Sequence, residues 1–224
     1  MRRPLAIGLA TFTLTAAAAA AALPLAPLSS VGPLKAAPAP GPLGPEGVPI
    51  PKGPVFADVQ TVKLGQTIDG VTCQRVEKIA FHIHAHLTLF VSGKAYVIPY
   101  GIGIGPPIGG VNTSVGPFVT NGSCFMWLHT HAADGIIHME APKLTSFTLG
   151  QFFEIWGVKL SPARVGAYKG QVTAFYNGKV WTGNPAKIPL PGEAQVQLDV
   201  GKPIVAPEHI RFPKGLAASM SRSK

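Results

Sequence analysis

Cysteines, charged residues and familiar catalytic motifs are all scarce in this sequence. Only two cysteines occur among 224 residues, which excludes a metal site built from four cysteines. The chain contains neither the G-x-S-x-G motif of serine hydrolases nor a P-loop, so the sequence indicates neither a serine nucleophile of that type nor a nucleotide-phosphate site. Charged residues make up 13% of the chain and never form a lysine or arginine run, which argues against nucleic-acid binding. We therefore interpret the net charge of +9 as favouring solubility and weak association with an anionic cell envelope.

The first residues have the pattern of an export signal. Met1–Arg3 form a short basic start, and residues 5–23 carry no charge and include seven consecutive alanines. This pattern predicts a secretory signal peptide over residues 1–26, with an uncleaved membrane anchor as the alternative. Both interpretations place the remaining chain outside the cytoplasm, in the periplasm, on the cell surface or in the medium.

Proline separates this segment from the folded part. Residues 24–54 hold ten of the 23 prolines and no aromatic residue, so residues 27–54 are predicted to form an extended linker without packed structure. The folded part is predicted to span residues 55–213, either as one β domain or as two subdomains, 55–116 and 117–213. Residues 214–224 form a basic tail.

Short alternating segments predict a mainly β fold with a mixed or antiparallel sheet. The strands are expected at residues 81–91, 94–99, 125–131, 136–140, 171–176, 179–182 and 194–200. One helix is expected to follow an N-terminal cap at Thr148, with Gln151 completing a capping box and Gly157 ending the helix. From Phe125 onward the order of strands and helix resembles the ββαββ order of β-grasp folds.

Six of the seven histidines lie between residues 82 and 138. His82, His84 and His86 alternate along one predicted strand, so the three imidazoles share one face. A polar strip facing solvent is the alternative, but such strips usually carry Thr, Lys, Glu or Ser. We interpret the pattern as part of a metal site.

The second group of histidines flanks a predicted hairpin turn. If Asp134-Gly135 forms a two-residue turn, His131 lies opposite His138 and His129 lies opposite Glu140, all on one face. A three-residue loop would break this register. Asp134 itself is expected to form local hydrogen bonds within the turn.

The candidate ligands suit copper or zinc. They are His82, His84, His86, His129, His131, His138 and Glu140. Such a set exceeds what one ion needs, which leaves open either one ion with supporting histidines or two neighbouring ions. Glu140 is a candidate ligand, a residue that orients a ligand, or a general base. Because several imidazoles would titrate together, metal affinity is expected to fall steeply as the pH drops through about 6.5.

The two cysteines are predicted to pair. Cys73 and Cys124 are 51 positions apart, and an exported chain meets oxidising conditions. The alternative is a thiolate copper site that also uses Met126. His209 stands apart from the other histidines and is interpreted as a surface residue.

Four motifs resemble those of an uncharacterised family of exported prokaryotic proteins. They are FHIHAHL at residues 81–87, WLHTH at 127–131, GIIHME at 135–140 and FTLGQFFEIWG at 147–157. Members of this family often have an acidic residue directly after HTH, where this chain has Ala132 and places its acid at Asp134. The resemblance indicates kinship without supplying an activity.

Three functions are compatible with these patterns. The leading hypothesis is an exported metal-binding protein that holds copper or zinc for handling or delivery. The first alternative is a hydrolase or oxidase with metal-bound water and Glu140 as the base. The second is a structural or adhesion module that binds no metal.

Overall fold

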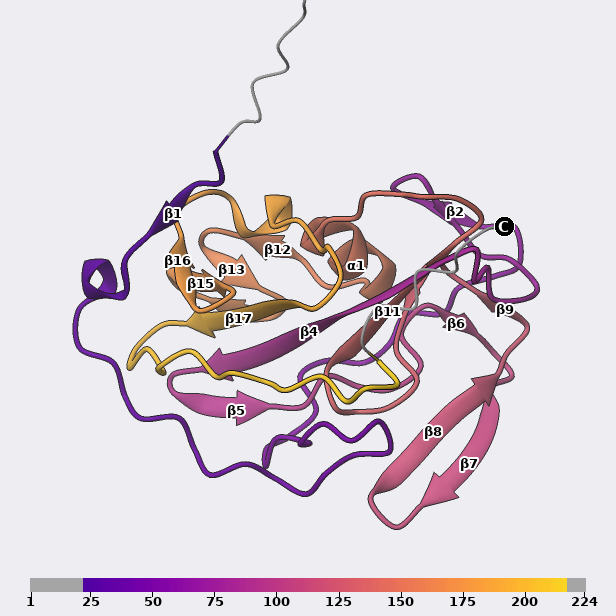
Figure 1. Cartoon of the computed structure of the whole chain (residues 1–224), viewed down its shortest axis with the longest axis horizontal. Coiled ribbons are helices and arrows are strands. Elements are labelled where there is room, and N and C mark those ends of the chain that lie inside the picture. Colours follow the sequence, from indigo (N-terminus) through magenta and orange to yellow (C-terminus); the bar gives the residue numbers. More distant parts are fainter. Residues whose placement is uncertain (1–21, 217–224) are drawn as a thin grey trace, which may run out of the picture.

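The computed structural model describes residues 22–216, and a mixed β-sheet forms the centre of the protein (Figure 1). The strands of this sheet lie in the order β1-β16-β15-β17-β4-β11-β10, and β5 pairs with β4 beside this path. Strands β17 and β4 are parallel, whereas the other pairs are antiparallel. The bounds are β1 Leu25–Ala26, β4 Phe81–Val91, β5 Lys94–Tyr96, β10 Leu128–His129, β11 Ile136–Ala141, β15 Val172–Tyr176, β16 Lys179–Trp181 and β17 Ala194–Val200. The predicted mainly β fold with a mixed sheet is confirmed.

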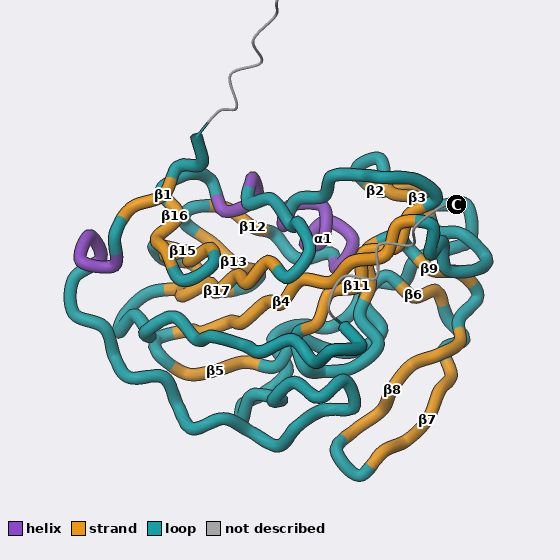
Figure 2. Tube along the Cα trace, in the orientation of Figure 1, coloured by secondary structure: helices purple, strands orange, loops and turns teal. Residues whose placement is uncertain are grey.

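Smaller elements surround this sheet (Figure 2). They are the pairs β2 Thr67–Ile68 with β3 Val71–Thr72, β6 Ile104–Gly105 with β9 Cys124–Phe125, and β7 Gly109–Thr113 with β8 Gly116–Asn121; the three-stranded sheet of β12 Leu160–Ser161, β13 Arg164–Val165 and β14 Tyr168–Lys169; and the 3₁₀ helices η1 Leu28–Val31 and η2 Pro185–Lys187. The β7–β8 hairpin was not predicted from the sequence.

Helix α1 (Leu149–Trp156) forms where the capping pattern predicts it. The backbone N–H of Gln151 donates to the Thr148 hydroxyl, and the Thr148 N–H donates to the Gln151 side chain, which completes the capping box. Gly157 ends the helix in the left-handed region at φ 80°. The buried side chains of α1 join one apolar core with the odd-numbered residues of β4, which include Ala85, Leu87 and Leu89. The even-numbered histidines of β4 therefore point to the opposite face of the sheet.

The order of strands around α1 differs in part from the prediction. Strands β4 and β11 precede the helix in the chain, and β15, β16 and β17 follow it. In the sheet these five strands lie in the order β11-β4-β17-β15-β16. The segment from Phe125 to His131, predicted as one strand, is split. Its first part belongs to β9, which pairs with β6, and β10 pairs with β11. The likeness to β-grasp folds stays a prediction.

Residues 22–54, here called the N-terminal strap, pack against the domain, so the predicted lack of packed structure was wrong. Leu25 pairs with Trp181, Lys35 forms a bridge with Val205, and Val48 is fully buried. Prolines remove backbone donors, but the remaining N–H and C=O groups still find partners, as the Lys35 N–H does at the Ile204 carbonyl. The chain thus runs extended over the sheet instead of away from it.

Two extended segments cover the face that carries the histidines. Val205, in the C-terminal run, packs against Phe90 of β4, and the Leu216 carbonyl accepts a hydrogen bond from His84. The strap lies beside this run (Figure 1). No helix within residues 22–216 is long and apolar enough to cross a membrane. The predicted signal peptide falls almost wholly outside these residues, and the predicted domain boundaries stay predictions.

Candidate metal centre

The pairing of three strands brings the candidate ligands into one row. Strand β11 lies between β4 and β10, so His138 sits opposite His84 on one side and opposite His129 on the other. Glu140 sits opposite His82. Because the side-chain period of a strand is two, these residues all project from the same face of the sheet. Sequence periodicity and long-range pairing thus converge on one cluster.

The predicted hairpin register was wrong by two residues. His129, rather than His131, lies opposite His138, and Leu128 lies opposite Met139. Pairing stops at His129, and residues 130–135 form a longer connection than the predicted two-residue turn. A shift of two residues leaves every side chain on its predicted face, whereas a shift of one would have reversed it. His131 reaches the cluster from this connection, with its ring centroid 4.3 Å from that of His138.

The cluster contains two overlapping sets of ligand atoms. The inner set, all buried, comprises His129, His131, His138 and Glu140; the outer set comprises His82, His84 and His138. Within each set the ligand atoms lie within 4.8 Å of one another. His82 is the most accessible ligand, with 24% of its side chain exposed. This buried His/Glu cluster could hold a metal ion.

Backbone carbonyls fix the protonation of three imidazoles. The Nδ1 atom of His129 lies 2.8 Å from the Met126 carbonyl, and that of His84 lies 2.9 Å from the Leu216 carbonyl. The Nδ1 atom of His131 likewise faces the carbonyl of Val119 in β8. A carbonyl oxygen can only accept, so each Nδ1 must donate its hydrogen, and each neutral ring keeps a lone pair on Nε2. Metal-binding histidines are commonly oriented in this way.

The lone pairs fixed by these bonds face other nitrogen atoms. The Nε2 atoms of His129 and His131 lie 3.0 Å apart. In the neutral rings both atoms are acceptors, so no hydrogen bond can join them, and their lone pairs repel each other. The Nε2 atom of His84 lies 3.0 Å from Nε2 of His82 and 3.1 Å from Nδ1 of His138. A shared cation between such atoms would turn the repulsion into attraction.

Burial keeps most of these imidazoles neutral. Removal from water, and after it the charge of the neighbouring His138, lowers the pKa of His84 to about 3 and that of His131 to about 4. Burial also lowers the pKa of His129 well below its usual value, and His131 adds to this effect. Protons therefore do not fill the gap between the Nε2 atoms of His129 and His131 at neutral pH.

His138 has the opposite electrostatic environment. Burial alone would lower its pKa, but hydrogen bonds to Glu140 and Glu46 outweigh burial and raise it to about 9. Burial would likewise raise the pKa of Glu140, but its hydrogen bonds to His138 and His82 hold that pKa well below the usual range. The distance from Nε2 of His138 to Oε1 of Glu46 is only 2.6 Å. His138 and the two carboxylates thus form the charged part of the cluster.

Sequence reasoning did not identify Glu46 as a functional residue. This residue lies in the N-terminal strap, 92 positions from His138, and only 4% of its side chain is exposed. It is the only acidic residue among residues 24–54, which is the one signal in the sequence that could have drawn attention to it. A carboxylate that accepts from the second nitrogen of a ligating histidine orients the ring toward the metal.

Replacing Glu46 by Gln is expected to lower the pKa of His138 by about 1–2 units, because the imidazolium loses one of its two carboxylate partners. Imidazole resonances followed by NMR over a pH titration of the metal-free chain measure this change. The matched control is Glu154→Gln on the exposed face of α1, which should leave the His138 titration unchanged. An unaltered pKa in Glu46→Gln would contradict the ion pair.

Two residues near the cluster take other roles. His86 was predicted as a ligand but belongs to neither set, because its Nε2 donates to the Asp134 carbonyl at 3.0 Å and its Nδ1 faces the Thr88 hydroxyl. Asp134 accepts from the Ile136 N–H, as expected for a turn residue. Burial and the nearby charge of Glu46 raise the pKa of Asp134 to about 7. The Asp134 carbonyl and carboxylate thus support the connection between β10 and β11.

The predicted disulfide is confirmed. Cys73 and Cys124 are bonded, with their Cα atoms 5.5 Å apart. The bond fixes the segment before β4 to β9, which leads into β10 and His129. Next to it the Trp127 indole donates to the side chain of Gln74. The two sulfur atoms are therefore not available as metal ligands while this bond is intact.

Comparison with known proteins adds no relative. No protein-family model, no curated protein and no solved structure matches this chain.

Proposed function

We propose that this chain is an exported metal-binding protein that holds copper or zinc in the histidine cluster, for metal handling or delivery. The observation that carries the proposal is the 3.0 Å separation of the Nε2 atoms of His129 and His131. Both are acceptors because Met126 and Val119 fix their tautomers. Metal coordination explains why two buried lone pairs converge, and simple packing does not.

The donor set favours copper or zinc over magnesium, calcium, manganese and iron(II). Five imidazoles and one carboxylate converge, and imidazole nitrogen suits copper and zinc better than magnesium or calcium. Copper(II) and zinc also bind such ligands more tightly than manganese or iron(II) do. Support for export comes from the disulfide, since such bonds persist in oxidising compartments, and from the basic and apolar pattern of the first residues.

Binding is better supported than hydrolysis. A general base works best with a pKa near the working pH, whereas the hydrogen bonds of His138 and His82 hold the pKa of Glu140 far below it. The adjacent cavity of about 480 Å³ is lined by His86 and Thr88 and by none of the ligands of either set. The convergence of the imidazoles also speaks against a purely structural module.

The test is a calorimetric titration of copper and zinc into the full chain, purified without a histidine tag, at pH 7.5. His131→Ala is expected to weaken binding at least about 100-fold. Removing a residue that only hydrogen-bonds a metal ligand already lowers metal affinity by about 10–100-fold, and the loss of a ligand itself should be at least as large. His131 is a useful choice because it lies outside the strands of the sheet, so its removal disturbs no strand pairing.

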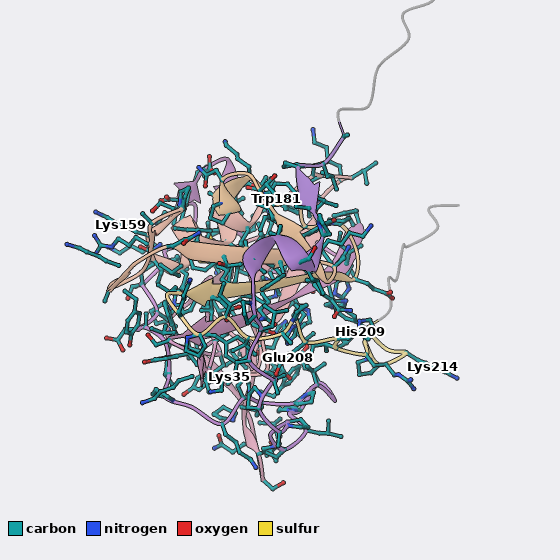
Figure 3. The ribbon with its side chains drawn as sticks, turned by 90° about the vertical axis from the view of Figure 1, so that its left-hand side faces the viewer. Lys35, Lys159, Trp181, Glu208, His209 and Lys214 are labelled. Atoms are coloured by element: carbon teal, nitrogen blue, oxygen red, sulfur yellow. A yellow bond between two sulfur atoms is a disulfide. The ribbon has the colours of Figure 1, made fainter. Side chains whose placement is uncertain are left out.

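Two histidine variants serve as controls. His86→Ala removes a buried imidazole from the same strand as His82 and His84 but no ligand atom. His209→Ala removes an exposed imidazole from the C-terminal segment (Figure 3). Both are expected to bind metal within a few-fold of the unaltered chain. Equal affinity in His131→Ala and both controls would overturn the proposal.

A further inference from the structure

The cluster offers more ligands than one copper or zinc ion uses. Six side chains contribute to the two sets, whereas tetrahedral sites take about four ligands. The surplus follows a pattern, because His129 and His131 form one close pair of Nε2 atoms and His82 and His84 form another, each 3.0 Å apart. His138 belongs to both sets. Its ring lies 4.4 Å from that of His84 and 4.3 Å from that of His131, between centroids.

We propose that the cluster is a dinuclear centre that holds two metal ions, with Glu140 shared between them. The inference rests on the proposed metal binding and specifies how many ions the site takes. One ion is held by His129, His131 and Glu140, and the other is held by His82, His84 and His138. In this division the inner ion has three protein ligands, the outer ion has four when the shared Glu140 is counted, and no nitrogen atom serves twice.

His138 can serve only one of the ions. Its Nε2 is engaged by Glu46 at 2.6 Å, which leaves Nδ1 as the ligand atom. That atom lies 3.1 Å from Nε2 of His84, which assigns His138 to the outer ion. The inner ion then needs another third ligand, and Glu140 belongs to the same set as His129 and His131.

Glu140 is placed to reach both ions. Its Oε1 lies 3.0 Å from Nε2 of His82 and 3.6 Å from Nδ1 of His138, two ligand atoms of the outer set. Its Oε2 is buried and has no hydrogen-bond partner within residues 22–216. A buried carboxylate oxygen without a partner is costly, and a carboxylate offers an oxygen to each of two neighbouring cations. The unpartnered Oε2 thus points independently to a second ion.

The charge around the cluster also fits two divalent ions. Glu46 contacts His138, and Glu77 lies 3.7 Å from Nε2 of His131. Asp134 adjoins Glu46, and in the part of the chain that the structure describes each has a buried carboxylate oxygen without a hydrogen-bond partner. Glu46 and Glu140, which both pair with His138, supply negative charge that the buried ions require.

Native mass spectrometry of the full chain loaded with copper(II) tests the proposal. The unaltered chain and the His209→Ala control are expected to bind two ions. His82→Ala/His84→Ala and His129→Ala/His131→Ala are each expected to retain one ion. A single ion in the unaltered chain would overturn the dinuclear centre while leaving the proposed function intact. Absence of any bound ion would overturn both.

Electron paramagnetic resonance of the copper-loaded, unaltered chain gives a second readout that needs no variant. Two copper(II) ions that share a carboxylate are expected to couple, so the integrated signal falls below two spins per chain. The His82→Ala/His84→Ala chain is expected to give the full signal of one uncoupled copper. A full signal of two independent spins in the unaltered chain would overturn the sharing of Glu140.

Discussion

Removal of the Cys73–Cys124 disulfide is expected to lower the free energy of unfolding by about 4 kcal/mol. The bond joins residues 51 positions apart, and a cross-link of that span removes about this much chain entropy from the unfolded state. Since single domains are stable by only about 5–15 kcal/mol, the loss would consume a large part of the margin. Urea unfolding of the Cys73→Ser/Cys124→Ser variant, compared with the unaltered chain, measures it.

Reduction provides the control for this experiment. Dithiothreitol should destabilise the unaltered chain by a similar amount and leave the double serine variant unchanged. The denatured but unreduced chain should contain no titratable thiol, because both cysteines are bonded. Two titratable thiols, or equal stability of variant and unaltered chain, would contradict the predicted role of the disulfide.

For the proposed outer ion, the affinity is expected to fall about tenfold for each pH unit between pH 8 and pH 5. The pKa of His138 is raised to about 9, so throughout this range its imidazole carries a proton that the metal must displace. Each unit of pH below that pKa lowers the neutral fraction about tenfold. The affinity therefore rises with pH and levels off only near pH 9.

The other buried imidazoles add little to this slope. The pKa values of His84 and His131 lie at about 3 and about 4, and that of His129 is also lowered, so these ligands stay neutral down to about pH 4. Burial thus removes His84, His129 and His131 from the steep loss near pH 6.5 that reference histidines would give, because it penalises the charged imidazole. Among the buried imidazoles, only His138 carries a proton that the metal must displace.

Zinc affinity measured by competition with a chelator at several pH values tests this slope. His138→Ala is the matched variant, and its remaining binding should vary less steeply over the same range, by about one proton per ion. An affinity independent of pH in the unaltered chain would contradict the electrostatic assignment, as would an identical slope in His138→Ala.

The sequence by itself determined which side chains share a face of a strand, where the helix begins and which cysteines pair. The alternation along β4 places His82 and His84 on the face opposite the apolar core, because the period of a strand is a local property. The capping box at Thr148 and Gln151 depends on neighbours three positions apart, and it forms as expected. The disulfide was predictable because only two cysteines exist.

The tertiary structure decided which of these histidines meet and what fixes their protons. The register of β10 differs from the predicted one because residues 130–135 form a longer connection than a two-residue turn. His86 lies outside the two ligand sets because its Nε2 donates a hydrogen bond to the Asp134 carbonyl. The contacts of Glu46 and of the Val119 and Leu216 carbonyls with the histidines join distant parts of the chain. No local sequence pattern predicts such contacts. Local geometry sets the direction of a side chain, whereas its partners depend on how distant segments pack. Here that packing brought alternating histidines together as close pairs of imidazoles.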